Sequence, residues 1–347
     1  MADDNLTGAI RPRTWNYFNK GISDEMISQR IRSVLVAHDR PDDFRETLRR
    51  HFPDVDFNFA TSDDGVAGAL AHHDPDAVFA VQHVSFSGAV LRAAMLHPSV
   101  KWLHVGGSGY DHLLPWPRDD IRVTTGAGVL APFLAESVFA GILALNGNLL
   151  LYGDQKRRQE WRAHSFRPLH DQTLLIVGLG SIGRFVARIA KAVGMRVIAI
   201  RRSASLPDAT VDEIYPPSAL RDIIGRADIV SLHVRLTQET AQMVDGHWLR
   251  AMKPGALLVN TSRGAVIDET ALIEALDSGH LKGAYLDVFA CEPLPAESRL
   301  WSLPNVLITP HVADSVTDWP QRYAMRFAQN LERWNEGKPL LSEISTR

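Results

Sequence analysis

Hydrophobic positions in the second half of the chain alternate between two patterns. Short apolar runs rich in β-branched residues occupy positions 174–177, 197–200, 229–232, 256–260, 284–288 and 306–309. Segments with helical spacing lie between the runs, and the first of them repeats apolar residues at Ile182, Val186, Ile189 and Val193 before Gly194. The alternation predicts a parallel sheet that is covered by helices.

The first half of the chain has a similar but less regular alternation. Its apolar runs lie at 31–36, 55–59, 77–81 and 102–105. We therefore expect a second α/β domain, so the predicted fold class is α/β with two Rossmann-like domains and helices flanking parallel sheets. Pro132 and the apolar segment 135–151 predict one long helix that bridges the domains.

The C-terminal segment has the pattern of an amphipathic helix. An apolar stripe is formed by Tyr323, Phe327, Leu331 and Trp334. The signals for helix start and stop lie around Asp318 and Gly337, respectively. A helix with one apolar stripe must pack that stripe against another part of the protein.

Composition and charge restrict the classes of function. The chain has 347 residues, and 37 Lys and Arg against 40 Asp and Glu give a net charge of −3, so a nucleic-acid or anionic-membrane partner is not expected. Cys291 is the only cysteine, which excludes an internal disulfide and a cysteine-based zinc cage, and we expect no metal.

Residues 1–5 are acidic, and the apolar stretch 138–152 is shorter than the roughly 20 residues of a membrane span, so we expect a cytoplasmic protein.

A glycine-rich motif follows the run 174–177 directly and opens the next helical segment. It consists of Gly178, Leu179, Gly180, Ser181, Ile182 and Gly183. In this position the first glycine permits a tight turn, the second lets the backbone approach a pyrophosphate, and the third lets helix and strand pack closely. The helix N-terminus adds amide donors for the phosphates. The motif therefore predicts a dinucleotide-binding site.

The residues at the end of the run 197–200 indicate which dinucleotide binds. Enzymes that use NAD usually have an acid here for the ribose 2′-hydroxyl, whereas this chain has Arg201, Arg202 and Ser203. Two guanidinium groups and a hydroxyl suit a 2′-phosphate, so NADP(H) is preferred and NAD(H) stays possible. The alternative is that both arginines are solvated surface charges.

Three further residues follow strand ends of the predicted parallel sheet, where ligands of such sheets gather. Arg263 can bind a substrate carboxylate and stabilise charge on a carbonyl oxygen. His311 can donate and accept a proton, because histidine titrates near neutrality, and Glu292 can favour its imidazolium form. The alternatives are that Arg263 forms a structural ion pair, that His311 is a structural histidine, and that Glu292 is a turn residue before Pro293. The set fits reduction of a 2-oxo acid.

Other candidate contacts also follow predicted strands. His233, Thr261 and Asp287 are candidate nicotinamide or ribose contacts, with structural hydrogen bonding as the alternative. Gly106 and Gly107 belong to a glycine-rich segment whose free amides could hold a carboxylate, unless the segment is only a turn. Val84 and Ser85, after the run 77–81, form the other candidate substrate loop.

These motifs together resemble the D-isomer-specific 2-hydroxyacid dehydrogenase family, which includes glyoxylate and hydroxypyruvate reductases. The similarity covers 161–313 and is strongest at 178–183, 259–268, 287–293 and 309–312. The family assigns substrate binding to Arg263, acid/base chemistry to His311 and orientation of that histidine to Glu292. It also implies dimerisation through the cofactor domain and a substrate domain that the C-terminal helix rejoins.

The resemblance implies these domain boundaries: an N-terminal extension at 1–30, a discontinuous substrate domain at 31–130 and 311–347, and a dinucleotide-binding domain at 131–310. Departures from the family are Arg201 in place of the usual acid, Arg235 where proline is frequent, and a loosely matching loop at 106–111. Arg235 could reinforce phosphate binding.

The expected partners are a small 2-oxo or 2-hydroxy acid and a second copy of the chain in a homodimer. Two alternatives remain for the function. One is a dehydrogenase of another small anion, such as formate or phosphite. The other is a nicotinamide-sensing regulator without enzymatic activity.

Overall fold

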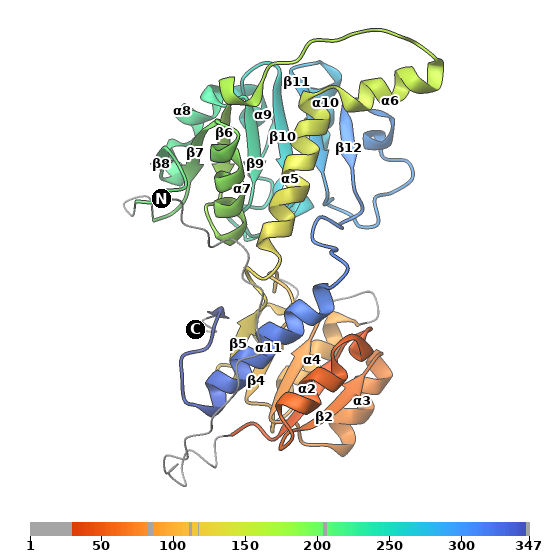
Figure 1. Ribbon diagram of the computed structural model, residues 1–347, viewed down its shortest axis with the longest axis vertical. Helices are drawn as coiled ribbons and strands as arrows, with labels where there is room; N and C mark the ends of the chain where they lie inside the picture. The colour runs from red at the N-terminus through yellow and green to blue at the C-terminus, as the bar shows by residue number, and fades with distance from the viewer. Residues whose placement is uncertain (1–29, 82–85, 111–112, 117, 204–206, 345–347) are drawn as a thin grey trace, which may run out of the picture.

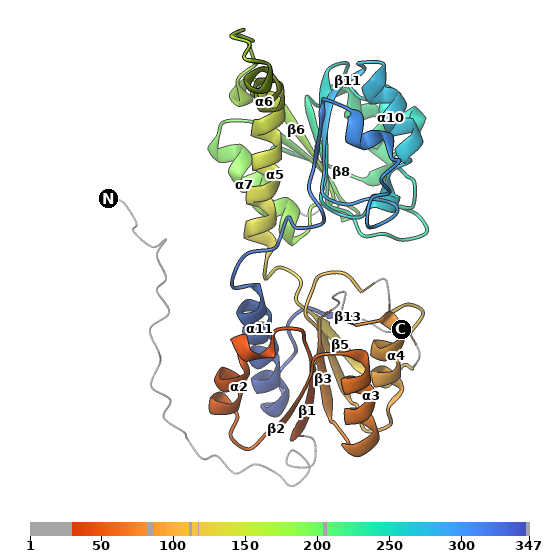
Figure 2. The same ribbon diagram turned by 90° about the vertical axis from the view of Figure 1, so that its right-hand side faces the viewer.

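The computed structural model describes residues 30–81, 86–110, 113–116, 118–203 and 207–344. The chain forms two lobes, each built on a sheet with helices on both faces (Figures 1 and 2). The predicted N-terminal extension lies outside the described residues, except for Arg30.

The first sheet has the strand order β13-β5-β4-β3-β1-β2. Its strands are β1 (Ser33–Ala37), β2 (Asp56–Ala60), β3 (Ala77–Ala80), β4 (Trp102–Val105), β5 (Arg122–Thr125) and β13 (Glu343–Ile344). They run parallel except β13, which pairs with β5 in the antiparallel sense. Its helices are α2 (Arg45–His51), α3 (Asp63–His72), α4 (Gly88–Leu96) and α11 (Trp319–Asn335).

The second sheet is parallel throughout and has the order β12-β11-β10-β9-β6-β7-β8. Its strands are β6 (Thr173–Val177), β7 (Arg196–Ile200), β8 (Glu213–Tyr215), β9 (Ile229–Leu232), β10 (Ala256–Asn260), β11 (Leu281–Leu286) and β12 (Val306–Ile308). Its helices are α5 (Ala131–Asn146), α6 (Leu149–Arg158), α7 (Ser181–Ala192), α8 (Leu220–Ile223), α9 (Gly246–Ala251) and α10 (Glu269–Asp277). The strand order reverses between β6 and β9, and ligands of such sheets bind at that crevice.

Short 3-10 turns connect several of these elements. They are η1 (Pro41–Asp43), η3 (Leu169–Asp171), η4 (Pro217–Ala219), η5 (Ile224–Arg226), η6 (Gly264–Val266) and η7 (Arg299–Ser302).

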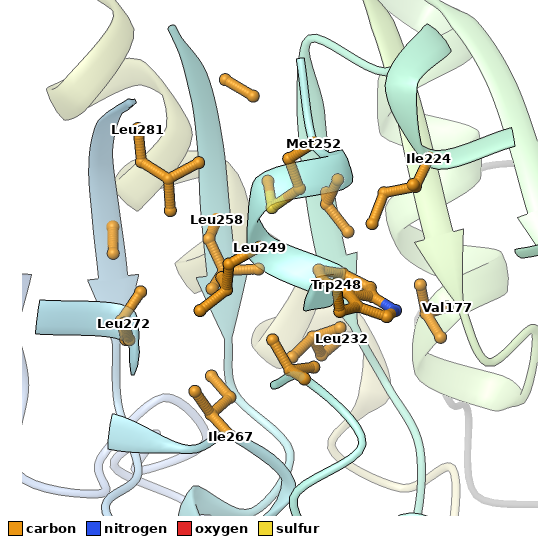
Figure 3. Packing of buried hydrophobic residues seen from close by; sticks show 14 of the residues in the cluster. Val177, Ile224, Leu232, Trp248, Leu249, Met252, Leu258, Ile267, Leu272 and Leu281 are labelled. Atoms are coloured by element: carbon orange, nitrogen blue, oxygen red, sulfur yellow. The ribbon is translucent and has the colours of Figure 1, made fainter. Parts of the chain in front are cut away.

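The second sheet is buried on both faces because neighbouring residues of a strand point to opposite sides. On β10, Leu258 packs with Trp248 and Leu249 of α9 (Figure 3), whereas Val259 belongs to the cluster on the other face. That other cluster contains residues of α5 and α7, and Figure 2 shows these helices on one side of the sheet with α10 on the opposite side. The continuous apolar runs seen in the sequence follow from this double burial.

The C-terminal helix α11 returns to the first lobe, as the family resemblance implied. The Phe327 ring stacks on Trp102 and on Phe79, with centroids 5.0 Å apart in both pairs. Tyr323 and Leu331 are buried in the same cluster. The substrate domain is therefore discontinuous, and the predicted fold class is confirmed.

The expectation of one long helix over 135–151 was wrong. The structure has α5 and α6, bent by 57° at the break between them. Asn148 adopts a left-handed conformation with φ of 60° there, which asparagine tolerates better than most residues. The break turns α6 away from the axis of α5.

Among the residues that the structure describes, no single helix is long and apolar enough to cross a membrane. The bent pair of α5 and α6 meets the criteria of length and composition only when the two helices are combined, and most of α5 is buried in the protein.

Candidate active site

The carboxyl ends of β9, β10, β11 and β12 meet at one edge of the second sheet because these strands are parallel. Loops at this edge approach the first lobe. Arg235, which follows β9, donates a hydrogen bond from Nη1 to the Tyr110 hydroxyl at 2.8 Å and lies 5.2 Å from the Tyr110 ring. Arg235 thus contacts the first lobe in this structure, where the sequence had suggested a phosphate contact.

His311 and Glu292 form a hydrogen-bonded pair at this edge. The distance from His311 Nδ1 to Glu292 Oε2 is 2.8 Å, and the His311 side chain is 48% exposed. The other carboxylate oxygen, Oε1, accepts a hydrogen bond from the Phe289 amide at 3.0 Å, which fixes the plane of the carboxylate. Because Glu292 engages Nδ1, the Nε2 atom is the ring nitrogen available to a substrate.

The backbone of His311 is held in a rarely populated conformation. Its φ is 54°, which is in the left-handed region, and its amide donates to the Asp287 carbonyl at 2.8 Å. The buried Asp287 carboxylate accepts hydrogen bonds from the amides of Val312 at 2.9 Å and Ala313 at 3.1 Å. Asp287 therefore positions the histidine loop, which matches the structural alternative for this residue.

Arg263 is placed beside the Glu292 segment by backbone packing. A Cβ added to the neighbouring Gly264 would lie 1.8 Å from the carbonyl carbon of Phe289, so these two segments can pass this closely only with glycine there. Asn260 donates a side-chain hydrogen bond to the Arg263 carbonyl at 3.0 Å and thereby fixes the turn. The structure thus brings together the segments that carry Arg263, Glu292 and His311.

Asp314 adds a carboxyl group that the sequence reasoning missed. Burial raises the pKa of Asp314 above its usual value, and the interactions with His311 and Arg263 offset only part of this shift. Asp314 therefore interacts electrostatically with both His311 and Arg263. No sequence signal pointed to this residue, since an acid three positions after a histidine is not distinctive.

The glycine-rich loop between β6 and α7 has the geometry that a pyrophosphate requires. Gly178 has φ of 103°, and a Cβ there would lie 2.4 Å from the His233 carbonyl oxygen. A Cβ on Gly183 would lie 2.4 Å from the Gly178 carbonyl oxygen, whereas one on Gly180 would meet no described atom within 4 Å. Gly180 therefore borders open space at the N-terminus of α7, where amide groups can bind phosphate.

Two buried polar atoms next to this loop also fit a dinucleotide. Neither Thr261 Oγ1 nor His233 Nδ1 has a hydrogen-bond partner among the described residues, and they follow the adjacent strands β10 and β9. Burial lowers the pKa of His233 to about 4, so its ring is neutral at physiological pH. Buried polar atoms are normally paired, so these two are suited to a polar group of a cofactor.

The residues that follow β7 differ in their environments. The Arg201 side chain is only 11% exposed; its Nη1 lies 3.5 Å from Asp208 Oδ2, and its Nε donates to the Ser203 carbonyl at 3.0 Å. Arg202 and Ser203 are exposed. The alternative of a solvated surface charge is therefore wrong for Arg201.

The free amides expected in the substrate loop are not present at Gly106 and Gly107. The Gly106 amide donates to the Ala80 carbonyl at 2.8 Å, and the Gly107 amide donates to the Val105 carbonyl at 2.9 Å. The first bond continues the pairing of β3 with β4 and the second closes a tight turn, so both donors are already used within the protein backbone. The other predicted substrate contacts, Val84 and Ser85, lie outside the described residues.

A two-lobed α/β fold with this phosphate loop and a histidine–carboxylate pair defines a dinucleotide-dependent dehydrogenase. The chain belongs to the D-isomer-specific 2-hydroxyacid dehydrogenase family. Residues 139–313 match the family model for the NAD-binding domain of D-isomer-specific 2-hydroxyacid dehydrogenases.

Curated relatives carry related activities. A glyoxylate reductase of Korarchaeum cryptofilum is 35% identical over 277 residues, which cover 76% of this chain and 81% of that protein. An (S)-sulfolactate dehydrogenase of Chromohalobacter salexigens is 37% identical over 218 residues, which cover 62% of this chain and 71% of that protein. The expected family is thereby confirmed.

Solved structures agree with the whole two-lobed fold. A family member from Aeromonas salmonicida is 32% identical and superposes with a TM-score of 0.80 over 91% of this chain and 99% of that chain. An NADPH-dependent glyoxylate/hydroxypyruvate reductase from Sinorhizobium meliloti, solved with NADP and sulfate, is 28% identical with a TM-score of 0.77 over 91% and 98%.

Proposed function

We propose that the protein is an NADPH-preferring reductase of small 2-oxo acids of the glyoxylate and hydroxypyruvate type, with the D-2-hydroxy acid as product. The observation that carries the proposal is the 2.8 Å pair of His311 and Glu292, held beside the Arg263 segment. In the reduction, a bound nicotinamide supplies the hydride to the carbonyl carbon.

The protein's own residues supply the remaining chemistry. His311 Nε2 donates a proton to the carbonyl oxygen as the carbon–oxygen π bond breaks, and the same atom accepts the proton in the reverse reaction. Glu292 holds the imidazole in orientation and stabilises its protonated form. Arg263 binds the substrate carboxylate and stabilises the negative charge that develops on the carbonyl oxygen.

The preference for NADPH rests on Arg201. Its largely buried position at the end of β7 keeps a positive charge where enzymes that use NAD usually have an acid. The Sinorhizobium meliloti enzyme, which shares the fold, is described as NADPH-dependent. Arg202 and Ser203 extend into solvent from the same loop and can add contacts to a 2′-phosphate.

Replacing Arg201 with aspartate should lower kcat/KM with NADPH by about tenfold or more, because a charge-assisted phosphate contact is lost and a negative charge is introduced. The value with NADH should stay the same or rise. Initial rates of glyoxylate reduction at 340 nm with both cofactors measure the ratio. Arg188→Asp makes the same change of charge on the exposed side of α7 and serves as the control. An unchanged NADPH/NADH ratio in Arg201→Asp would contradict the proposed role.

A substrate screen separates the two alternative functions from the proposed one. Turnover of formate or phosphite in place of 2-oxo acids would assign another small anion. Binding of NADPH without turnover of glyoxylate, hydroxypyruvate, pyruvate or phenylpyruvate would indicate a nicotinamide sensor.

We also infer a homodimer that uses α6 and the segment after it. This region projects from the second lobe (Figures 1 and 2) and exposes large apolar side chains: Leu149, Leu151, Trp161 and Phe166. Trp161 is 104% exposed, which is unusual for an aromatic residue unless a partner covers it. Sedimentation should show a dimer for the natural protein and a monomer for the double variant Trp161→Ser, Phe166→Ser. A monomeric natural protein would contradict the inference.

The cytoplasmic location stays a prediction.

A further inference from the structure

A charged cluster lies beside the end of β7 and is centred on the Asp208 carboxylate. Asp208 Oδ2 accepts a hydrogen bond from Arg184 Nε at 2.7 Å and pairs with Arg201 Nη1 at 3.5 Å. Asp208 Oδ1 accepts bonds from the Thr210 hydroxyl at 2.6 Å and from the Thr210 amide at 3.1 Å. The side chains of Arg201 and Asp208 are 11% and 10% exposed, so this cluster is not a loose surface pair.

The contacts of Asp208 decide which role it can play. A carboxylate offers about four lone-pair sites; three accept the hydrogen bonds from Arg184 and from the hydroxyl and amide of Thr210, and Arg201 adds an ion pair to Oδ2. Both carboxylate oxygens of Asp208 are thus engaged with groups of the protein, unlike the acid that binds a ribose hydroxyl in enzymes that use NAD. Asp208 serves as an anchor for its two arginine neighbours.

The two arginines come from different elements that border the cofactor loop. Arg184 lies in the first turn of α7, directly after Gly183, and Arg201 directly follows β7. Two guanidinium groups and one carboxylate leave a net charge of +1 at this place. Burial opposes ionisation of Asp208, but the bonds from Thr210 and Arg184 lower its pKa to about 2, so the carboxylate is charged at neutral pH.

We propose that Asp208 is a positioning residue that holds Arg184 and Arg201 side by side, pre-organised for the 2′-phosphate of an adenine dinucleotide. This inference rests on the NADPH preference proposed above and adds Arg184 to the phosphate site. Long arginine side chains lose rotamer freedom when they bind, and an anchor that already restricts them reduces that loss.

Asp208→Asn tests the proposal because the amide nitrogen of asparagine would face the guanidinium donors and release them. The probes are 2′,5′-ADP, which carries the 2′-phosphate, and 5′-AMP, which lacks it; calorimetry on the full chain measures both dissociation constants. We expect about three- to tenfold weaker binding of 2′,5′-ADP by Asp208→Asn, and 5′-AMP binding within about twofold of the natural protein.

Three further variants make the test specific. Thr210→Val removes a hydrogen bond to Asp208 without changing any charge, and it should weaken 2′,5′-ADP binding in the same direction by a smaller factor. Arg184→Gln should also weaken 2′,5′-ADP selectively. Asp212→Asn is the control, because Asp212 pairs with Lys191 and with the Val197 amide near the opposite end of β7. If Asp208→Asn does not fold, Thr210→Val and Arg184→Gln decide.

The outcomes separate this inference from the proposed function. A natural protein that binds both probes equally would overturn the NADPH preference and the inference with it. If the natural protein prefers 2′,5′-ADP but Asp208→Asn leaves its affinity unchanged or tightens it, only the positioning role is overturned. Equal weakening of both probes would also overturn that role, because Asp208 would then support the cofactor loop in general.

Discussion

Replacing His311 with alanine is expected to lower kcat for glyoxylate reduction by roughly 100-fold or more, the usual contribution of a positioned general acid. The Nε2 proton donor would be lost, while the cofactor loop, which lies on β6 and α7, would be untouched. The dissociation constant of NADPH should therefore stay within about threefold of the natural value. Steady-state rates at saturating glyoxylate and a fluorescence titration of NADPH provide the two measurements.

Two companion variants sharpen the His311 experiment. Glu292→Gln keeps the size of the side chain but removes its charge, so kcat should fall in the same direction by a smaller factor. His170→Ala removes an exposed histidine of the cofactor domain and should leave kcat unchanged. A decrease of less than about threefold in His311→Ala would exclude this residue as the acid.

Replacing Arg263 with alanine should lower kcat/KM by about 100- to 1000-fold, because binding of the carboxylate and stabilisation of the developing oxyanion are lost together. Arg263→Lys should recover only part of the loss, since an ammonium group cannot make the forked contact of a guanidinium. NADPH affinity should change little in both variants. The measurement is the dependence of the initial rate on glyoxylate concentration at saturating NADPH.

The control for the Arg263 variants is Arg299→Ala, which removes a surface arginine of the same domain that pairs with Asp277. Its kinetic constants should match those of the natural protein. A full return of activity in Arg263→Lys would show that a point charge is sufficient. The forked contact assigned to Arg263 would then be incorrect.

Most strands were predictable because their residues are buried on both faces and therefore form continuous apolar runs. The strands that the sequence did not reveal are β5, β8 and β13. They are short, and β8 and β13 carry charged residues at the edges of their sheets, where one side of a strand is not paired. β5 and β8 each pair with the strand that precedes them, and β13 forms by pairing with the distant β5. Local sequence carries little information about them.

The candidate site was predictable where residue type and strand position coincide. The glycine loop, Arg263, Glu292 and His311 each follow a strand of a parallel sheet, and the carboxyl ends of such strands meet at one edge. The structure changed the interpretation of the residues whose role depends on contacts with the protein backbone. In the structure the Asp287 carboxylate holds the histidine loop, and the amides of Gly106 and Gly107 donate to backbone carbonyls.

The sequence by itself determined the parallel α/β class, the position of the dinucleotide loop and the residues available for proton transfer and carboxylate binding. These follow from local periodicity and from the few residue types that can do the chemistry. Only the tertiary structure decided that Asp208 lies between Arg184 and Arg201, and that Arg235 reaches Tyr110 in the other lobe. The physical reason is that these contacts join residues of different elements, and their existence depends on how sheets, helices and lobes pack.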